Sequence, residues 1–350
     1  MAPADDTSRR RWIFGGVAAL AGVVLIAGGV YLGVSNHSGS PPAPTGLAPL
    51  TPSGRVGSVI TSPASPAPAV NPLTGEGPSG RVLAVKVDNV GAAQFEQSGL
   101  DSADVVYVIQ VEGGLSRYLA VFDSANAPAS VGPVRSARQT DIPLLAAYGD
   151  VGFAYSGAIA GLLPQLAVAD MRNITPAADP ALFSNHGNDP TYIDPAAIFA
   201  AFPDLAEEQD VGLGFGAEPA GGQAAGSVSV SMPSAAFTFT AVGDKWQVSV
   251  DGHQAAGDQG PTTADNVIVQ HVLVVPGEFT DHNAAQPANE VFSETTGAGA
   301  ADFYRDGEVW HGEWLKPSGS SPTAYTVGGV PMSLAPGRTW IVLDGSAGTG

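Results

Sequence analysis

The chain has 350 residues and a formal net charge of −19, with 33 acidic and 14 basic side chains. An acidic balance this strong argues against nucleic acid as a partner, because phosphate binding needs a basic face. The sequence contains no cysteine, which excludes disulfides, thiolate metal sites and an acylated cysteine as a lipid anchor.

The first 34 residues predict a cytoplasmic tip and a membrane anchor. Arg9, Arg10 and Arg11 form a basic cluster, and residues 12–34, a run of 23, carry no charge. A helix rising about 1.5 Å per residue covers about 35 Å over that run, enough for a hydrocarbon core of about 30 Å. The basic flank places the N-terminus in the cytoplasm. The alternatives are a cleaved signal peptide, which lacks a clear A-x-A site here, and a twin-arginine signal.

Residues 35–78 predict a disordered stalk. Pro, Ser, Gly, Thr and Ala dominate this segment, and large apolar side chains are scarce. Such a composition cannot bury enough surface to offset the entropy of ordering the chain. We therefore expect the folded part to be held outside the cytoplasm, away from the cell membrane.

The first globular segment, residues 79–210, is expected to alternate strands with helices. The pair Gly113-Gly114 predicts a two-residue hairpin, in which Gln110 pairs with Arg117 and shares a sheet face with Glu112 and Arg117. Thr140 is a candidate N-cap. The expected strands are 82–87, 104–111 and 115–122, and the expected helices are 140–148 and 195–202.

The second globular segment, residues 227–345, is expected to be rich in strands and to follow a Gly/Ala-rich linker within residues 204–227. Asp306-Gly307 predicts a tight hairpin turn. The chain is thus expected to begin with a transmembrane helix and a disordered stalk. A two-part α+β ectodomain follows, with mixed β/α layers in which sheet packs on sheet together with helices. The expected strands are 228–232, 236–239, 245–250, 267–275, 301–304, 308–314 and 339–343.

Ordered motifs from Asn71 to Leu343 resemble the YerB-like bacterial envelope proteins, a family built from the N- and C-terminal domains of unknown function 3048. The resemblance implies a two-part fold with mixed β and α layers on the outer face of the membrane, and it implies no established activity. The motifs are Asn71-Pro72-Leu73-Thr74-Gly75, Ala84-Val85-Lys86-Val87-Asp88-Asn89, Val111-Glu112-Gly113-Gly114, Gly132-Pro133-Val134-Arg135-Ser136-Ala137-Arg138 and Leu334-Ala335-Pro336-Gly337-Arg338-Thr339-Trp340.

Two departures from the family pattern matter for function. Relatives are anchored by a lipidated cysteine or by a membrane helix, and this chain has only the helix to use. Where the family reads Pro-His-Asn before an aromatic residue, this chain reads Gly187-Asn188-Asp189-Pro190-Thr191-Tyr192. A histidine with a chemical role in relatives would be missing here, unless His186 replaces it.

Arg117, Arg135 and Arg138 form the constellation that most resembles a binding site. Two guanidinium groups before a helix N-terminus predict an anion site, and Glu112 or Asp88 beside them is a candidate general base. The alternative is structural, with Arg135 and Arg138 paired internally with carboxylates such as Glu112, Asp88 or Asp104.

Other catalytic and metal signals are weak. The histidines outside the anchor show no i, i+2 or i, i+4 pairing and no H-E-x-x-H pattern, so we expect no metal. His271 lies in an apolar strand and is expected to be a satisfied core histidine. The chain also lacks a G-x-S-x-G nucleophile elbow, and residues 212–216 lack the lysine of a phosphate-binding loop, so we expect no cofactor.

Two classes of function remain open. The first is an envelope module that binds an anionic cell-wall polymer or a partner protein. The second is an enzyme acting on a phosphorylated or uronic envelope polymer, with Arg135 and Arg138 holding the anion. An enzyme needs Glu112 or Asp88 within reach of an open cleft beside both arginines, whereas a binding module needs only a groove or a broad surface.

Overall fold

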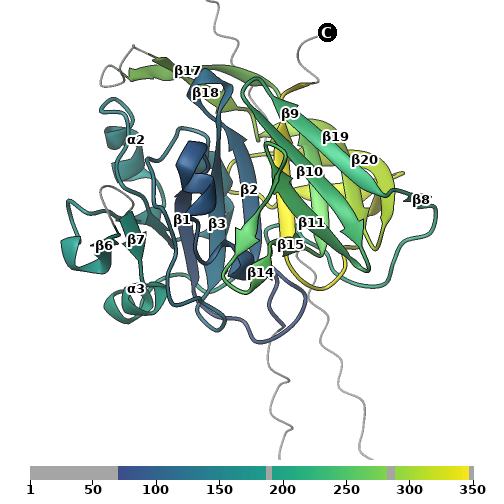
Figure 1. The fold of residues 1–350 in the computed structure, drawn as a ribbon, viewed down its shortest axis with the longest axis horizontal. Helices are drawn as coiled ribbons and strands as arrows, with labels where there is room; N and C mark the ends of the chain where they lie inside the picture. Colours follow the sequence, from purple (N-terminus) through teal and green to yellow (C-terminus); the bar gives the residue numbers. More distant parts are fainter. Residues whose placement is uncertain (1–69, 187–190, 282–287, 347–350) are drawn as a thin grey trace, which may run out of the picture. The chain divides into compact units, whose positions relative to one another are not determined.

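A mixed sheet of twelve strands is the centre of the fold (Figure 1). The computed structural model describes residues 70–186, 191–281 and 288–346. In spatial order the strands are β22 (Val330–Pro331), β21 (Ala324–Val327), β20 (Glu308–Lys316), β19 (Gly297–Arg305), β16 (Asn266–His271), β23 (Thr339–Asp344), β2 (Val105–Gln110), β3 (Ser116–Asp123), β1 (Val82–Asp88), β4 (Val151–Ala154) and β5 (Met171–Ile174), with β8 (Gln223–Ala224) beside β20.

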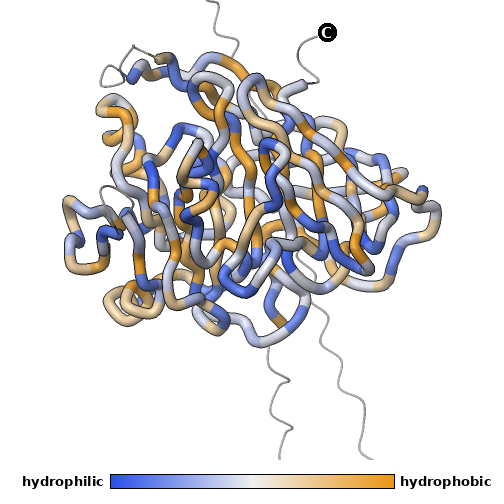
Figure 2. Tube along the Cα trace, viewed as in Figure 1, coloured by the Kyte–Doolittle hydropathy of each residue, from blue (hydrophilic) through white to orange (hydrophobic). Residues whose placement is uncertain are grey.

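Both globular segments contribute to this one sheet. The last strand, β23, lies between β2 and β16 and pairs with each of them in parallel. Every residue of β1 and β23 is buried. Strands covered on both faces need nearly continuous apolar sequences, which explains why these strands lack a clean alternation of apolar and polar residues. In Figure 2 orange segments of high hydropathy run along the central strands.

A second, smaller sheet packs on one face of the large sheet. Figure 1 shows its strands crossing in front of the C-terminal strands. The ring of Trp340 on β23 contacts Tyr118 and Phe239 edge-on, at centroid distances of 5.3 and 5.8 Å. These strands are β12 (His253–Gln254), β11 (Lys245–Val250), β10 (Ala235–Val242) and β9 (Ser227–Met232), with β15 (Thr263–Ala264) beside β11.

Helices α1 (Asp141–Leu145) and α2 (Leu163–Val168) pack on the opposite face, whereas α3 (Pro195–Ala201) packs in the core on the side of the small sheet. The hydroxyl groups of Tyr107 on β2 and Tyr148 are 3.0 Å apart and buried together. The 3-10 helices are Gly91–Phe95, Leu100–Ser102, Glu112–Gly114, Ala146–Tyr148 and Pro180–Leu182. Three two-stranded ribbons complete the fold: β6 (Phe183–Asn185) with β7 (Thr191–Ile193), β13 (Ala256–Gly257) with β14 (Gly260–Pro261), and β17 (Val274–Asp281) with β18 (Ala288–Ser293).

The expected α+β class with a preceding membrane helix is wrong. The described residues are 47% strand and only 13% helix, so the fold is mainly β. The C-terminal strands extend the first sheet edge to edge as well as packing on it, because β23 returns to the centre. Within the described ranges no helix has the length and hydrophobicity needed to cross a bilayer. The expected anchor, residues 12–34, lies outside those ranges.

The predicted hairpin at Gly113-Gly114 has a different register. Val111 and Leu115 close a five-residue connection, and Gln110 lies opposite Ser116 while Arg117 lies opposite Ile109. Because side chains alternate along a strand, this shift of one residue moves Gln110 to the face opposite Arg117. The other hairpin prediction is confirmed, since Asp306 and Gly307 both have positive φ and connect Arg305 to Glu308.

The end of the expected stalk belongs to the folded body. Leu73 is fully buried, and the Asn71 side chain accepts the backbone N–H of Leu73 at 2.7 Å. The Asn71 amide also donates to Asp123 at 2.9 Å, which ties this turn to the end of β3. Most of the expected stalk, residues 35–69, lies outside the described ranges.

The expected linker is likewise packed. Val211 and Leu213 are only 5% and 6% exposed, and Phe215 forms a β-bridge with Leu334. The helix predicted over 195–202 is confirmed as α3, and its N-cap Asp194 accepts two backbone N–H groups.

Replacing Leu73 by Ala tests whether residues 70–78 are part of the core. We expect the free energy of unfolding of the full-length protein to fall by about 2–5 kcal/mol, because a fully buried leucine leaves a cavity. Urea denaturation monitored by tryptophan fluorescence measures this loss. Val70→Ala is the control, since Val70 is 60% exposed and its truncation should change stability by less than about 0.5 kcal/mol. Equal small losses in both variants would contradict the packed position.

Candidate functional site

Residues 133–138, the arginine-rich segment, lie along the end of β1. Val134 forms a β-bridge with Val87, and the Arg135 N–H donates to the Lys86 carbonyl at 2.8 Å. This pairing brings residues 133–138 beside the β2–β3 connection, where Glu112 lies. The structure places Arg138 beside Glu112 and Arg135 and Arg117 beside Asp88 in this region.

Arg138 is buried and its guanidinium is occupied by internal partners. Its Nε lies 2.6 Å from Glu112 Oε1, and its Nη2 donates to Glu112 Oε2 at 2.8 Å. Its Nη1 donates to the carbonyls of Ser136 and Ala137 at 3.2 and 2.9 Å. The whole residue is 4% exposed. This arrangement holds the arginine-rich segment against the β2–β3 connection.

Asp88 forms an ion pair with Arg135 and lies opposite Arg117 in the sheet. The Arg135 Nε lies 2.8 Å from Asp88 Oδ2, and the Arg135 side chain is 47% exposed. Arg117 lies directly opposite Asp88 in the β1–β3 register, and its Nη1 donates to the Ser136 carbonyl at 3.3 Å. Burial, followed by the charge of Arg138, lowers the pKa of Arg117 to about 10. A hollow of about 180 Å³ is lined by Asp88, Arg135 and Glu96.

Lys86 and Asp141 form a fully buried ion pair beneath these arginines. The Lys86 Nζ lies 2.6 Å from Asp141 Oδ1, and both side chains have no exposed surface. The second oxygen of Asp141 accepts the backbone N–H of Arg138 at 2.7 Å. Burial lowers the pKa of Lys86, and the Asp141 carboxylate opposes that shift. One carboxylate thus joins β1, the arginine-rich segment and the start of α1.

The predicted N-cap Thr140 does not cap helix α1 with its side chain. Helix α1 has five residues, and Thr140 makes no side-chain cap, because its Oγ1 accepts the backbone N–H of Ser293 at 3.0 Å. Glu290 completes this region, with Oε1 accepting the Gln139 N–H at 2.7 Å. Burial raises the pKa of Glu290 to about 7. In the sequence Glu290 lies between Asn289 and Val291, and this local pattern did not single it out.

A row of acid and histidine side chains crosses four neighbouring strands, β23, β16, β19 and β20. His271 lies between two carboxylates, with Nδ1 3.0 Å from Asp344 Oδ2 and Nε2 3.3 Å from Asp302 Oδ2. His311 Nδ1 lies 2.6 Å from the other oxygen of Asp302. We call Asp344, His271, Asp302 and His311 the polar ladder. The sequence prediction of His271 as a satisfied histidine is consistent with its two partners, although its side chain is 23% exposed.

The polar ladder shifts the pKa values of His271 and Asp344. The hydrogen bond to Asp344 raises the pKa of His271 despite partial burial, and Asp302 adds to this effect. Burial alone would raise the pKa of Asp344, but hydrogen bonds from His271 and Ser346 outweigh it and lower the pKa. A histidine with both ring nitrogens facing carboxylates favours the imidazolium form, since both nitrogens then donate.

A groove of about 610 Å³ borders the polar ladder. Its floor is the start of β19, where Gly297, Ala298, Gly299 and Ala300 have little or no side chain. At Gly299 a Cβ would lie 2.6 Å from Trp314 Nε1 and 2.8 Å from the His271 carbonyl, two atoms that are hydrogen-bonded to each other. An adjoining groove of about 610 Å³ shares Ala298–Ala300 and Trp314 and includes Glu313 and Leu315.

The residues able to hold a metal lie apart from both regions. Across the described ranges, the one group of three carboxylate or histidine side chains close enough to share an ion is Asp104, Asp123 and Glu208. Asp104 precedes β2, whereas Glu112 follows it, so this group lies at the other end of that strand. In the sequence Asp104 stands out only as an internal partner for an arginine, and no local pattern connects it with Glu208, 104 residues further along the chain.

Removing the Arg138 guanidinium should be far more costly than removing that of Arg135. Arg138→Ala leaves Glu112 buried without its cation, and we expect a loss of about 3–5 kcal/mol in the free energy of unfolding. Arg135→Ala breaks a half-exposed pair and should cost less than about 1 kcal/mol. Chemical denaturation of both variants measures the difference. Similar losses would contradict the structural position of Arg138.

The polar ladder predicts that the stability of the protein depends on pH in a defined way. Because its folded pKa is raised above the ordinary value of 6.5, the contribution of His271 is complete below that value and is lost as pH rises through the folded pKa. The lowered pKa of Asp344 acts in the opposite direction, so its contribution is lost as pH falls below the ordinary value of 3.8.

The difference in unfolding free energy between wild type and His271→Gln should therefore be largest between pH 3.8 and 6.5. It should shrink as pH rises through the folded pKa of His271 and as pH falls below 3.8. Urea midpoints across the pH range provide the measurement. Parallel pH profiles for the two proteins would show that the ladder carries no such coupling.

Comparison with known proteins identifies the family. The model of the DUF3048 N-terminal domain, a protein of unknown function, matches residues 72–208, and that of the DUF3048 C-terminal domain matches residues 227–341. "Putative lipoprotein YerB" of Bacillus subtilis is 41% identical over 86 residues, which span 25% of each chain. The crystal structure of YerB from Bacillus subtilis covers 79% of this chain and 97% of that one, with a TM-score of 0.67 and 23% identity, and so shares the fold. The resemblance seen in the sequence motifs is confirmed, and the chain belongs to the DUF3048 family.

Proposed function

We propose that this protein is a non-catalytic binding module of the bacterial envelope that binds a partner protein through the groove beside the polar ladder. The observation that carries the proposal is the pair of exposed leucines at the two adjoining grooves, Leu273 at 52% and Leu315 at 49% exposure. Exposed apolar side chains around a concave surface mark sites of association.

The charge around the grooves favours a basic partner. Glu294 lines the first groove and Glu313 the second. Asp302 pairs with His271, which lines the first groove. The whole chain carries a net charge of −19. Charge complementarity guides protein association and suppresses unsuitable partners. The proposed occupant is therefore a protein segment that presents lysine or arginine side chains beside apolar ones.

The proposed location of this protein in the envelope rests on its similarity to YerB of Bacillus subtilis. YerB of Bacillus subtilis carries the name "Putative lipoprotein", and 86 residues of this chain align with it. The acidic composition agrees with a role that does not involve nucleic acid. We extend the envelope location to this chain as part of the proposal.

The enzyme alternative has less support. It requires Glu112 or Asp88 at an open cleft beside both arginines, but Glu112 is paired with buried Arg138 and Asp88 with Arg135. The hollow beside Arg135 is lined by Asp88 and does not reach Glu112 or Arg138. A general base must reach the proton that it abstracts, and both of these carboxylates already neutralise internal cations.

Binding of an anionic cell-wall polymer is the second candidate, and the half-exposed guanidinium of Arg135 favours it. Asp88 and Glu96 line the same hollow, so two carboxylates oppose an anion there. An anionic polymer is therefore a less favoured ligand than a basic protein segment.

Calorimetric titration with two defined probes tests these candidates. The first is a peptide of alternating lysine and leucine, and the second is polyphosphate. We expect the peptide to bind and Leu315→Asp to weaken it about fivefold or more, because an apolar contact worth about 1 kcal/mol is replaced by a charge that needs solvation. Leu163→Asp on α2 is the matched control, since Leu163 is 46% exposed and lies outside both grooves.

Three titration results would contradict the proposal. Peptide binding that is equal in wild type, Leu315→Asp and Leu163→Asp would exclude the grooves as the binding face. Polyphosphate binding that disappears in Arg135→Ala would transfer the function to the arginine hollow. Binding of neither probe would reject both candidates as formulated.

A further inference from the structure

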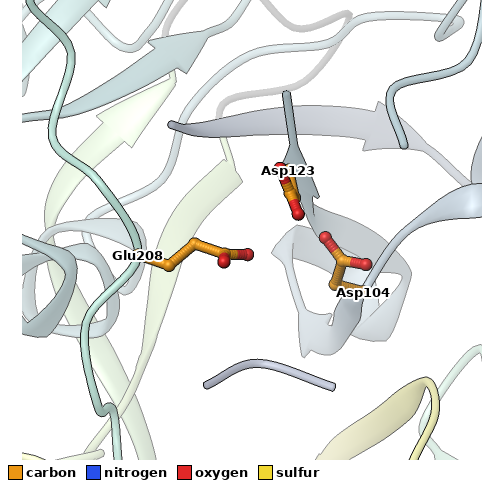
Figure 3. A group of neighbouring side chains, drawn as sticks. All are labelled: Asp104, Asp123 and Glu208. Atoms are coloured by element: carbon orange, nitrogen blue, oxygen red, sulfur yellow. The ribbon is translucent and has the colours of Figure 1, made fainter. Parts of the chain in front are cut away.

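Three carboxylates from distant parts of the chain meet beside the ends of β2 and β3. Asp104 immediately precedes β2, Asp123 is the last residue of β3, and Glu208 follows α3. Figure 3 shows the Glu208 side chain reaching toward Asp123 and Asp104. One oxygen from each carboxylate lies within 4.8 Å of the others.

Asp104 and Asp123 are buried and Glu208 is partly buried, and two oxygens of the group have no hydrogen-bond donor. Asp104 and Asp123 are 4% and 1% exposed. Asp104 Oδ2 and Glu208 Oε1 are buried atoms without a hydrogen-bond partner among the described residues. Buried polar atoms are nearly always satisfied, so these two oxygens point to a missing positive group.

The remaining oxygens are held by groups that fix the geometry without supplying charge. Asp123 accepts the Asn71 amide at 2.9 Å and the Ala125 N–H at 2.6 Å. Glu208 accepts the Gly80 N–H at 3.3 Å. Gly80 leaves room for this approach, because a Cβ there would lie 2.2 Å from Asp123 Oδ1. In the described part of the chain, no lysine or arginine forms an ion pair with any of the three carboxylates.

The electrostatic cost of three adjacent anions is high. Burial, then the charges of Asp123 and Glu208, raise the pKa of Asp104 to about 8, although Arg338 acts to lower it. Burial also raises the pKa of Glu208 to about 7. Stable ionisation of all three groups thus requires a compensating cation between them.

We propose that Asp104, Asp123 and Glu208 bind a calcium ion. Calcium–oxygen distances of about 2.4 Å allow ligand oxygens to lie up to about 4.8 Å apart across the ion, and these three oxygens all lie within 4.8 Å of one another. Calcium accepts six to eight oxygens in flexible geometry, so three carboxylates and water complete its shell. Magnesium demands a smaller and more regular octahedron and fits this set less well.

Calcium at this position would fasten three segments to each other. Asn71 and Gly80 belong to the turn before β1, Asp104 and Asp123 to the β2–β3 pair, and Glu208 to the segment that leads into the C-terminal half. The ion would bind the folded state and not the unfolded chain, and it would therefore raise the melting temperature by mass action. Millimolar calcium suits an extracytoplasmic site of modest affinity.

Thermal melts of the full-length protein after removal of metal by EDTA and dialysis test the proposal. Calcium at about ten times its dissociation constant should raise Tm by about 3–6 °C. Magnesium at the same concentration, and sodium chloride at matched ionic strength, should each give a smaller shift. Titration calorimetry at pH 7.5 should detect one calcium per chain.

Asp104→Asn and Glu208→Gln should each abolish the calcium-dependent shift. Glu207→Gln is the matched control, because Glu207 is the adjacent acid, is exposed and is not part of the group. Calorimetric binding by wild type that is unchanged in Glu208→Gln would overturn the site even if Asp104→Asn fails to fold. A wild-type Tm that responds equally to calcium and to matched sodium chloride would show that protons, and not a metal ion, neutralise the group.

Discussion

The buried ion pair between Lys86 and Asp141 is the constraint on which the N-terminal half depends. A lysine in the middle of a fully buried strand is tolerated only because a carboxylate meets it at 2.6 Å. That same carboxylate accepts the Arg138 N–H, which sets the position of the arginine-rich segment over the sheet. Arg138 can then reach Glu112, and Arg135 can reach Asp88.

Buried charges and the charges around the grooves therefore have different roles in this protein. The buried cations hold elements of the fold together. Exposed Leu315 and Glu313, in contrast, line a groove over β19 and β20. The polar ladder lies at the border between these zones, because it fixes four strands to one another and also edges a groove. This separation explains why the motif that most resembled a site in the sequence is mostly structural in its contacts.

The sequence predicted local structure well and long-range pairing poorly. Asp194 and the Asp306-Gly307 turn were recognisable because cap and turn chemistry act over a few residues. The Gly113-Gly114 register was missed because Val111 and Leu115 closed a longer connection than two glycines imply. Clusters such as Asp104 with Glu208 could not be predicted, since their contact depends on how segments 104 residues apart in the chain are packed.

The central position of β23 has a consequence for the order of folding. Strand β2 pairs with β3 on one side, but its other side is completed only by residues 339–344. During synthesis the first half of the chain therefore exposes an unpaired strand edge in the middle of its future sheet. Parallel pairing over such sequence separations is slow, because the intervening loop must close first. The interval before β23 docks is the period in which this chain is most vulnerable to aggregation and proteolysis.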